Sequence, residues 1–181
     1  MAALEFARAT GLACPAGCGD CCVNDEPEDS VLAALPAARW AVANGLAERL
    51  SGAAQSAPYG PCVFYNAERA QHCTVYPLRP LLCRLFGFAG RRDKQGAAQY
   101  RPCRRMNAGA GAVSAAPPLF GEQASRLESI HPALGGRRLP MNLAFAEAAA
   151  WLLLRSQYAT DGPDDRTPPA PKPTRPRPRA A

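Results

Sequence analysis

The stretch Cys14-Pro-Ala-Gly-Cys18-Gly-Asp-Cys21-Cys22 carries four thiols within nine residues, a density that suits a metal site. Glycines at positions 17 and 19 permit positive φ, so a short loop can turn its amide N–H groups toward sulfur. If the stretch is helical instead, Cys14, Cys18 and Cys21 share one face. Both conformations bring the sulfurs together. Because neighbouring side chains diverge, we expect Cys21 and Cys22 to serve two centres, or one of them to be spare.

Four further thiols lie in residues 62–105: Cys62, Cys73, Cys83 and Cys103. Cys83 falls near the start of a helix predicted over residues 77–86, where unpaired N–H groups and the helix dipole favour a thiolate. Four thiolates around Zn²⁺ or a [4Fe–4S]²⁺ cluster leave a net charge of about −2. Arg79 and Arg84 are candidate cofactor-binding residues that could offset this charge. For Arg104 and Arg105 we expect a solvated side chain or a carboxylate partner.

Large apolar residues are scarce in this chain of 181 residues. Leu, Ile, Val and Phe together number 31, whereas alanine alone numbers 37. A share of large apolar residues below about 20% with a high net charge is typical of disordered chains, but a net charge of +6 is only moderate. We therefore expect a thin apolar core and a fold that the cysteines help to hold together.

Hydrophobic spacing predicts a mainly α fold with little β structure. A helical stretch over residues 27–50 has four apolar residues on one face: Val31, Leu35, Ala38 and Val42. Pro36 can begin a second segment of it, and Asn44-Gly45 can interrupt it. Residues 63–65 and 74–76 are short enough to form a small hairpin. The helix over 77–86 would tolerate Pro80 in its first turn.

Two helices are predicted after the cysteine-rich part, over residues 119–130 and 140–158. Each has a stripe at helical spacing: Phe120, Ala124, Leu127 and Ile130 on the first, and Met141, Phe145, Ala148 and Leu152 on the second. Trp151 and Leu153-Leu154 broaden the second stripe, so we expect this helix to be the central apolar buttress. Trp40 and Trp151 are expected to be packing residues.

These elements predict one cysteine-cluster domain over residues 1–160. Its metal-binding part covers residues 14–105, and its helical buttress covers residues 118–159. Residues 161–181 contain seven prolines and no Leu, Ile, Val or Phe. Such a segment cannot bury enough apolar surface to offset the entropy of ordering, so we expect a disordered Pro/Arg-rich tail.

The sequence predicts neither a membrane span nor a secretory signal. The longest apolar run, residues 143–154, is interrupted by Glu147, and a span needs about 18 apolar residues. Residues 1–12 carry Glu5 and Arg8 in the middle of what would be the apolar stretch of a signal peptide. We therefore expect a cytoplasmic protein without a membrane partner. In that reducing compartment dense cysteines are typical of metal binding or catalysis rather than disulfides.

A second string combines Cys62 with Cys73-x-x-Tyr76-x-x-Arg79-Pro80-x-x-Cys83-Arg84-x-Phe86. Together with the first cluster it resembles the bacterial CxxCxxCC family of zinc- or iron-chelating proteins (YkgJ-like proteins), over roughly residues 14–105. Three residues separate Cys14 from Cys18, whereas the family's opening gap usually has two. The resemblance implies metal binding, most often described as an iron–sulfur cluster. A related cysteine cluster occurs in the longer flagellin lysine methylases, but no methyl-donor site is apparent here.

We take all eight cysteines as candidate metal ligands: Cys14, Cys18, Cys21, Cys22, Cys62, Cys73, Cys83 and Cys103. The spacings match neither a zinc ribbon nor a bacterial ferredoxin. Zinc and iron–sulfur both accept four thiolates, and the resemblance favours iron–sulfur, most simply [4Fe–4S], with zinc as the alternative. His72 could replace a sulfur, but we expect a solvated histidine in a turn. We expect His131 to lie at the C-terminus of a helix, where the partial negative charge of the helix end favours a histidine.

Two other functions remain open from the sequence. Cys18 and Cys21 could form the dithiol of a thiol-redox enzyme, although the βαβ pattern of such enzymes is missing. A zinc-dependent nucleic-acid-binding module is supported only by positive charge, so nucleic acid is not an expected partner. The sequence shows no Ser/His/Asp arrangement, paired carboxylates or phosphate-binding glycine loop, and whether the protein is an enzyme stays open. The metal centre would be structural or would transfer electrons.

Overall fold

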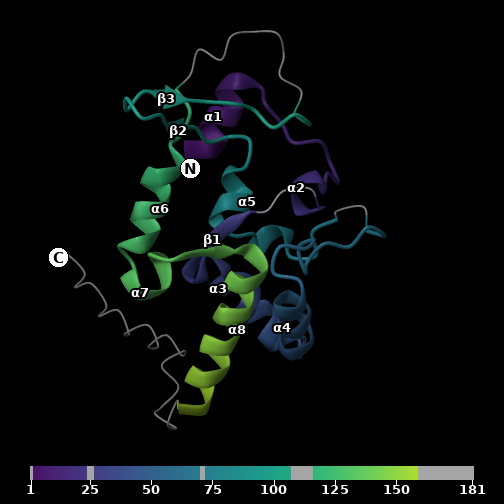
Figure 1. Cartoon of the computed structure of the whole chain (residues 1–181). Coiled ribbons are helices and arrows are strands. Elements are labelled where there is room, and N and C mark those ends of the chain that lie inside the picture. The colour runs from purple at the N-terminus through teal and green to yellow at the C-terminus, as the bar shows by residue number, and fades with distance from the viewer. Residues whose placement is uncertain (1, 24–26, 70–71, 107–115, 159–181) are drawn as a thin grey trace, which may run out of the picture.

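The computed structural model of the protein describes residues 2–23, 27–69, 72–106 and 116–158. Its helices are α1 (Ala2–Thr10), α2 (Asp20–Val23), α3 (Val31–Ala43), α4 (Ala47–Ser56), the 3-10 helix η1 (Tyr76–Leu78), α5 (Leu81–Leu85), α6 (Phe120–Glu128), α7 (Pro132–Gly135) and α8 (Met141–Tyr158). Its strands are β1 (Glu28–Ser30), β2 (Arg91–Arg92), β3 (Ala98–Gln99) and β4 (Arg138–Pro140). The fold is mainly α, as predicted (Figure 1).

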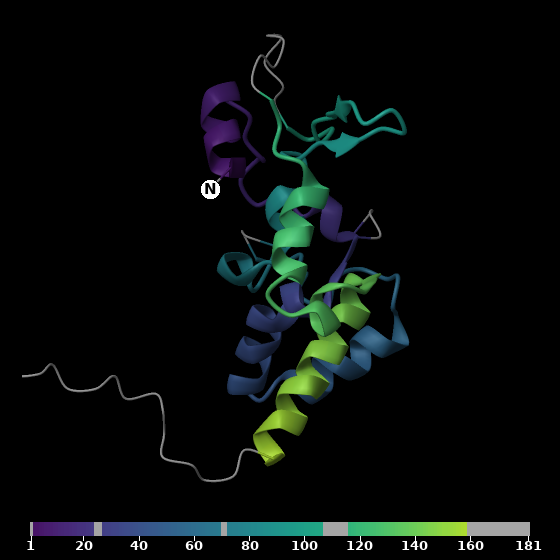
Figure 2. The same cartoon turned by 90° about the vertical axis from the view of Figure 1, so that its left-hand side faces the viewer.

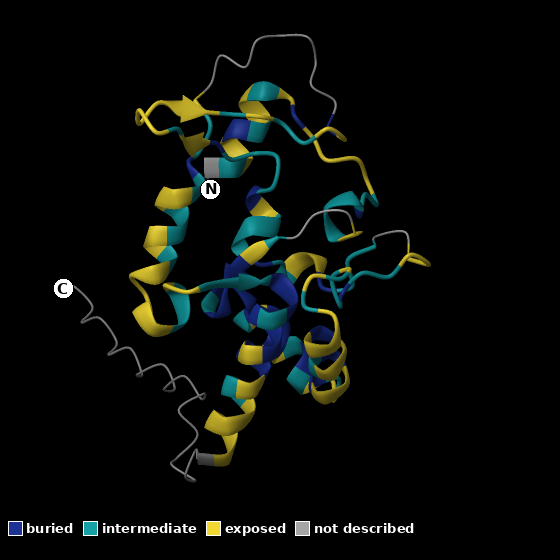
Figure 3. Cartoon of the chain, in the orientation of Figure 1, coloured by how far each residue is buried: buried dark blue, intermediate teal, exposed yellow. Residues whose placement is uncertain are grey.

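Helices α3, α4 and α8 pack together at one end of the molecule (Figures 1 and 2). Six alanines at their contacts are completely buried: Ala38, Ala41, Ala54, Ala144, Ala148 and Ala149. We call the buried residues of these three helices the alanine core, and the dark blue of Figure 3 is concentrated there. Alanine lets helices approach closely, so the abundance of alanine builds this core rather than weakening it.

Aromatic rings connect the alanine core to the cysteine-bearing loops. The rings of Phe145 on α8 and Phe64 lie edge to face, with centroids 4.8 Å apart. Trp40 on α3 contacts the other side of Phe64 at 6.4 Å, so Trp40 packs as predicted. Phe145 and Phe64 are both buried, and such pairs add about 0.5–1.5 kcal/mol beyond their burial.

The helical stretch expected over residues 27–50 is divided differently from the prediction. Residues 28–30 form strand β1, which pairs antiparallel with β4, so the helix starts only at Val31. The side chain of Ser30 caps it by accepting from the Ala33 amide. Pro36 lies inside α3 without ending it, because packing against α8 outweighs one lost hydrogen bond. The interruption at Asn44-Gly45 is confirmed, with Gly45 at φ +66°.

The cysteine-bearing segment has less regular structure than predicted. The expected hairpin of residues 63–65 with 74–76 is reduced to one antiparallel bridge, between Tyr65 and Cys73. The expected helix over 77–86 is split into η1 and α5. Pro80 precedes α5 instead of lying in its first turn, since a proline keeps the residue before it extended. The regular hairpin lies elsewhere, where β2 pairs with β3.

The N-terminal helix α1 was not anticipated by the sequence analysis. Phe6 and Leu12 are buried against Met106, and the Phe6 ring meets the edge of Tyr100 at 5.1 Å. The Tyr100 hydroxyl donates to the Gly87 carbonyl at 2.7 Å. This small N-terminal cluster lies beside the β2–β3 hairpin, at the opposite end from the alanine core (Figure 1).

The predicted C-terminal helices form as α6 and α8, but several outward-facing residues differ from the prediction. Ile130 is 73% exposed, and Leu153 and Leu154 also lie at the surface, so they do not broaden the buried stripe. Trp151 is half-buried and meets the edge of His131. His131 is not at a helix C-terminus that favours positive charge: it caps α7, with Nδ1 accepting from the Leu134 amide.

The predicted tail over residues 161–181 lies outside the described residues. Within the described ranges, no helix is both long enough and apolar enough to cross a membrane.

Candidate metal centre

One cavity of about 480 Å³ gathers most of the cysteines. Seven line it: Cys14, Cys18, Cys21, Cys22, Cys62, Cys73 and Cys83. All eight cysteines of the chain are free thiols. The seven that line the cavity come from the loop before α2, from α2, from the turn with the Tyr65–Cys73 bridge and from α5. The structure therefore brings the first predicted cluster together with three of the four cysteines of the second.

Four of these thiols are close enough to influence one another's ionisation. The pKa of Cys83 is raised above its ordinary value by burial first, and then by the nearby charges of Cys62, Cys21, Asp29 and Cys73. Burial also raises the pKa of Cys62 to about 11, and Cys73 and Cys21 add to that rise. The pKa of Cys73 is raised by burial and, more weakly, by Cys21. We call these four residues the cysteine quartet, because every pair within it interacts.

Backbone amides point at two sulfurs of the quartet. The amides of Phe64 and Tyr65 lower the pKa of Cys62, and the Tyr65 amide donates to the Cys62 carbonyl at 2.8 Å. The amide of Val75 lowers the pKa of Cys73 in the same way. Each donor follows its cysteine by two or three residues. Amide N–H groups directed at sulfur stabilise a thiolate and tune a metal bound to it.

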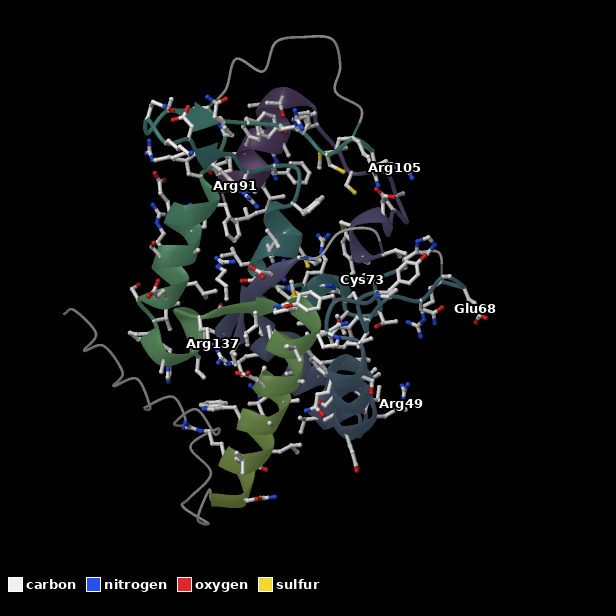
Figure 4. All side chains as sticks on the ribbon, viewed as in Figure 1. Arg49, Glu68, Cys73, Arg91, Arg105 and Arg137 are labelled. Atoms are coloured by element: carbon white, nitrogen blue, oxygen red, sulfur yellow. The ribbon has the colours of Figure 1, made fainter. Side chains whose placement is uncertain are left out.

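A second set of thiols adjoins the quartet through Cys21. The pKa of Cys14 is raised by Cys18, by Cys21 and then by Cys103, in addition to burial. Burial is the first cause of that rise, to about 11. Cys103 lines a neighbouring cavity rather than the main one. Figure 4 shows sulfur atoms both beside Arg105 and nearer Cys73. The structure therefore does not bring all eight predicted ligands into one group.

Cys21 and Cys22 both line the main cavity, so the expectation that they serve two centres, or that one is spare, stays a prediction. Cys21 influences the quartet and also Cys14. The Cys22 carbonyl accepts from the Cys62 amide at 2.8 Å, which fixes the first loop against the second cluster.

The sulfurs are gathered but not closed around a point. Among the residues that the structure describes, no three His, Cys, Asp or Glu side chains lie in an arrangement that could hold one metal ion. A single tetrahedral zinc would require its sulfurs to approach one another to about 3.8 Å. The donor set, seven thiols around one cavity, fits a thiophilic metal by its chemistry.

The two predicted cofactor-binding arginines border the main cavity. Arg79 lies with its guanidinium 3.6 Å from the centre of the Tyr76 ring, and its charge lowers the pKa of Cys73. Arg84 donates to the carbonyls of Arg79 and Pro77, which braces the turn before α5. Both side chains place positive charge beside the quartet.

Arg104 and Arg105 have a carboxylate partner, as expected. Both donate to Asp20, at 2.9 Å and 3.0 Å. These bonds, first from Arg105 and then from Arg104, lower the pKa of Asp20 to about 2. The pairing ties the segment after Cys103 to the start of α2, which carries Cys21.

Asp29 is a supporting residue that the sequence analysis missed. It is completely buried in β1. One carboxylate oxygen accepts from the Leu82 amide at 2.7 Å, which caps α5 from a distant strand and so positions Cys83. The other accepts from the Ser30 amide at 2.8 Å. Burial raises the pKa of Asp29. No local pattern around Asp29 signals this role, because its partner Leu82 lies 53 residues further along the chain.

Asn142, at the start of α8, is a second supporting residue that the sequence analysis missed. Its side-chain oxygen accepts from the Val63 amide at 3.1 Å, and its amide group donates to the carbonyls of Ala57 and Pro61. Asn142 is 2% exposed. The loop that carries Cys62 is thus fastened to the alanine core. A polar residue in an otherwise apolar helical stripe was the available sequence signal.

Gly19 of the first cysteine cluster lies directly against Tyr65 and His72 of the second. A Cβ atom at position 19 would lie 2.5 Å from the Tyr65 ring and 2.8 Å from His72 Nδ1, so only glycine fits. Gly17 has the expected positive φ of 69°, but Gly19 does not. His72 is not the expected solvated residue. Its Nδ1 is buried, without a hydrogen-bond partner among the described residues.

The comparisons with known proteins agree with this site. Residues 13–104 match the model of the family CxxCxxCC, described as "Putative zinc- or iron-chelating domain". The chain belongs to this family. The CxxCxxCC match covers about half the chain and includes all eight cysteines, while α6 and α8 lie outside it. No curated protein and no solved structure matches the chain.

Proposed function

We propose that the protein binds its metal through the cysteine quartet, Cys21, Cys62, Cys73 and Cys83, and that the bound group is a [4Fe–4S] cluster. The mutual proximity of these four thiols carries the proposal. Membership of a zinc- or iron-chelating family supports the general function. Four thiolates complete the ligand set of such a cluster.

The preference for a cluster over one zinc ion rests on the family, whose members are most often described as holding an iron–sulfur cluster. Both kinds of centre accept four thiolates. Arg79 and Arg84 line the cavity and would offset the excess negative charge of a four-thiolate centre.

The metal would hold the cysteine-bearing loops together. Thiols with raised pKa values are protonated at neutral pH, so metal binding releases their protons and replaces repulsion among thiolates with bonds to the metal. A structural site contributes roughly 10–16 kcal/mol of apparent binding free energy. A cluster could also transfer electrons. Eight free thiols suit a reducing compartment, and we assign the protein to the cytoplasm on that ground.

The other four predicted ligands do not bind this cluster in the proposal. Cys14, Cys18 and Cys103 remain candidate ligands of a second centre, since Cys103 and Cys18 both raise the pKa of Cys14. Cys22 is assigned as the spare member of the adjacent pair.

The test is to measure iron, zinc and acid-labile sulfide in the full chain purified without oxygen, together with its visible absorption. Cys83→Ser and Cys62→Ser are compared with the matched control Cys22→Ser, and circular dichroism checks their folding. We expect iron and sulfide in the wild type and in the Cys22 variant, and loss of most of both in the quartet variants.

Two results would overturn the proposal. Stoichiometric zinc without sulfide would replace the cluster with a zinc site. Equal metal loss in the Cys22 and Cys83 variants, or a wild type without either metal, would remove the quartet from its assigned role.

A further inference from the structure

A second cavity adjoins the main one along α5. Its volume is about 560 Å³, within the range of roughly 300–1,000 Å³ typical of small-molecule sites. Three arginines line it, from three separate segments: Arg91 on β2, Arg101 in the loop before Cys103, and Arg138 on β4. Leu85 and Phe86 line both cavities, so the two are neighbours but distinct.

Arg138 is held in place by the fold. It donates to the Glu28 carbonyl at 3.2 Å and lies 3.6 Å from the buried carboxylate of Asp29. Its guanidinium is also 4.4 Å from the centre of the Phe120 ring. These contacts with Glu28, Asp29 and Phe120 hold Arg138 in the wall of the cavity.

Arg91 and Arg101 differ from the paired arginines of this protein. The structure gives neither of them an ion pair or a side-chain hydrogen bond among the residues it describes. Their neighbour Arg92, by contrast, is paired with Glu122 at 3.0 Å. Glu28 also lines the cavity, and its single charge leaves the lining net positive. Guanidinium groups bind carboxylate and phosphate oxygens with two parallel hydrogen bonds, so Arg91 and Arg101 are suited to bind an anionic group in this cavity.

The rest of the lining is apolar. Leu82 and Leu85 of α5 form part of the wall together with two aromatic residues, Phe86 and Phe120. A free inorganic ion would leave this surface and most of the volume unused. A ligand with an anionic group at the arginines and an apolar or aromatic body would use both.

We propose that this cavity binds a small organic anion, in which a phosphate or carboxylate group meets Arg91 and Arg101 and an apolar body lies against Phe86 and Phe120. The proposal is independent of the metal proposed above, because none of the quartet lines this cavity. Of the cysteines, Cys103 lines it.

The experiment titrates the full chain, as purified, with phenyl phosphate and separately with inorganic phosphate by calorimetry at physiological ionic strength. The test variant is Arg91→Gln/Arg101→Gln. The control, Arg39→Gln/Arg49→Gln, removes the same charge from α3 and α4, and Figure 4 shows Arg49 far from Arg91. Circular dichroism confirms that both variants fold.

Phenyl phosphate is expected to bind the wild type and the control alike, and to bind the test variant at least about tenfold more weakly, because both charged donors to its phosphate are removed. Inorganic phosphate is expected to bind more weakly than phenyl phosphate. The proposal is overturned if phenyl phosphate does not bind, if both variants lose affinity equally, or if inorganic phosphate binds as tightly as phenyl phosphate.

Discussion

The alanine core and the cysteine-bearing side are built in opposite ways. The core consists of helices of 13, 10 and 18 residues that bury one another's small side chains. On the cysteine-bearing side, α2, η1 and α5 have 4, 3 and 5 residues, and the turn between Cys62 and Cys73 has one bridge. Helices this short do not persist on their own in water.

The difference shows that the two regions depend on different forces. Apolar burial can stabilise the core, even though its residues are small. The cysteine-bearing side is attached to the core by the polar bonds of Asp29 and Asn142 and by the buried Phe64 and Val75, while its buried thiols repel one another once ionised. Under the function proposed above, this side also depends on a bound metal, and the two regions are then expected to respond differently to its removal.

Removal of the metal is expected to have the largest effect. A chelator, applied in reducing buffer, should lower the melting temperature and expose residues 62–104 to proteases, because the thiolate bonds to the metal are lost. Limited proteolysis with mass mapping locates the cuts, and circular dichroism follows the helices. An unchanged cutting pattern and an unchanged spectrum in fully metal-free protein would show that the loops hold together without metal.

Phe145→Ala tests the other side of the comparison. Its ring fills the space between α8 and Phe64, so its loss should reduce the free energy of unfolding by about 3–5 kcal/mol. Denaturant titration measures this change. The control is Leu154→Ala on the same helix, whose side chain is 55% exposed and should change stability by less than about 0.5 kcal/mol. Equal effects of the two substitutions would mean that the core is not tightly packed.

Asp29→Asn tests the junction between the regions. Asparagine has one acceptor oxygen, so one of the amides of Leu82 and Ser30 loses its partner, at a cost of about 1–3 kcal/mol. The pKa of Asp29 is raised in the folded protein. Asp29 therefore contributes its full stabilisation at a pH below its ordinary pKa of 3.8, and this stabilisation is lost as the pH rises through the raised pKa. The gap between wild type and variant should therefore narrow as the pH rises, in unfolding measured at several pH values. A constant gap would mean that Asp29 has an ordinary pKa.

Asp20→Asn is expected to have the smallest effect and the opposite pH dependence. The pKa of Asp20 is lowered to about 2 by Arg105 and Arg104. Its contribution is present above 3.8 and is lost as the pH falls through about 2. The gap between wild type and variant should close on acidification, which thermal melts in a fixed metal state would show. A gap that widens in acid would contradict the assigned ion pairs.

The sequence predicted the parts of the fold that depend on local patterns. The stripe of Met141, Phe145 and Ala148 on α8 and the break at Asn44-Gly45 follow from helical spacing and glycine. The alanine content looked like a weakness from the sequence, because composition does not show that alanines face one another across helices. The prediction that Pro36 begins a second segment was wrong for the same reason: Pro36 lies inside α3, and packing between helices keeps the helix continuous there.

The sequence predicted which residue type forms the candidate site, but not which of the cysteines lie together. The spacing of the cysteines indicated metal binding, and the family match agrees. The separation of Cys103 from the quartet could not be predicted, since it depends on how α1 and the loop before Met106 pack. Asp29 accepts from Leu82, which lies 53 residues away in sequence, and Asn142 accepts from Val63, which lies 79 residues away. No local sequence pattern predicts contacts over such separations.

Amide hydrogen exchange, resolved by segment in metal-loaded and metal-free protein, tests most directly whether the two regions depend on different forces. Metal removal should collapse the protection of residues 62–85 while α3 and α8 keep theirs. If the helices and the cysteine-bearing segment lose protection together, or if neither changes, the separation of apolar and metal-dependent stability is wrong.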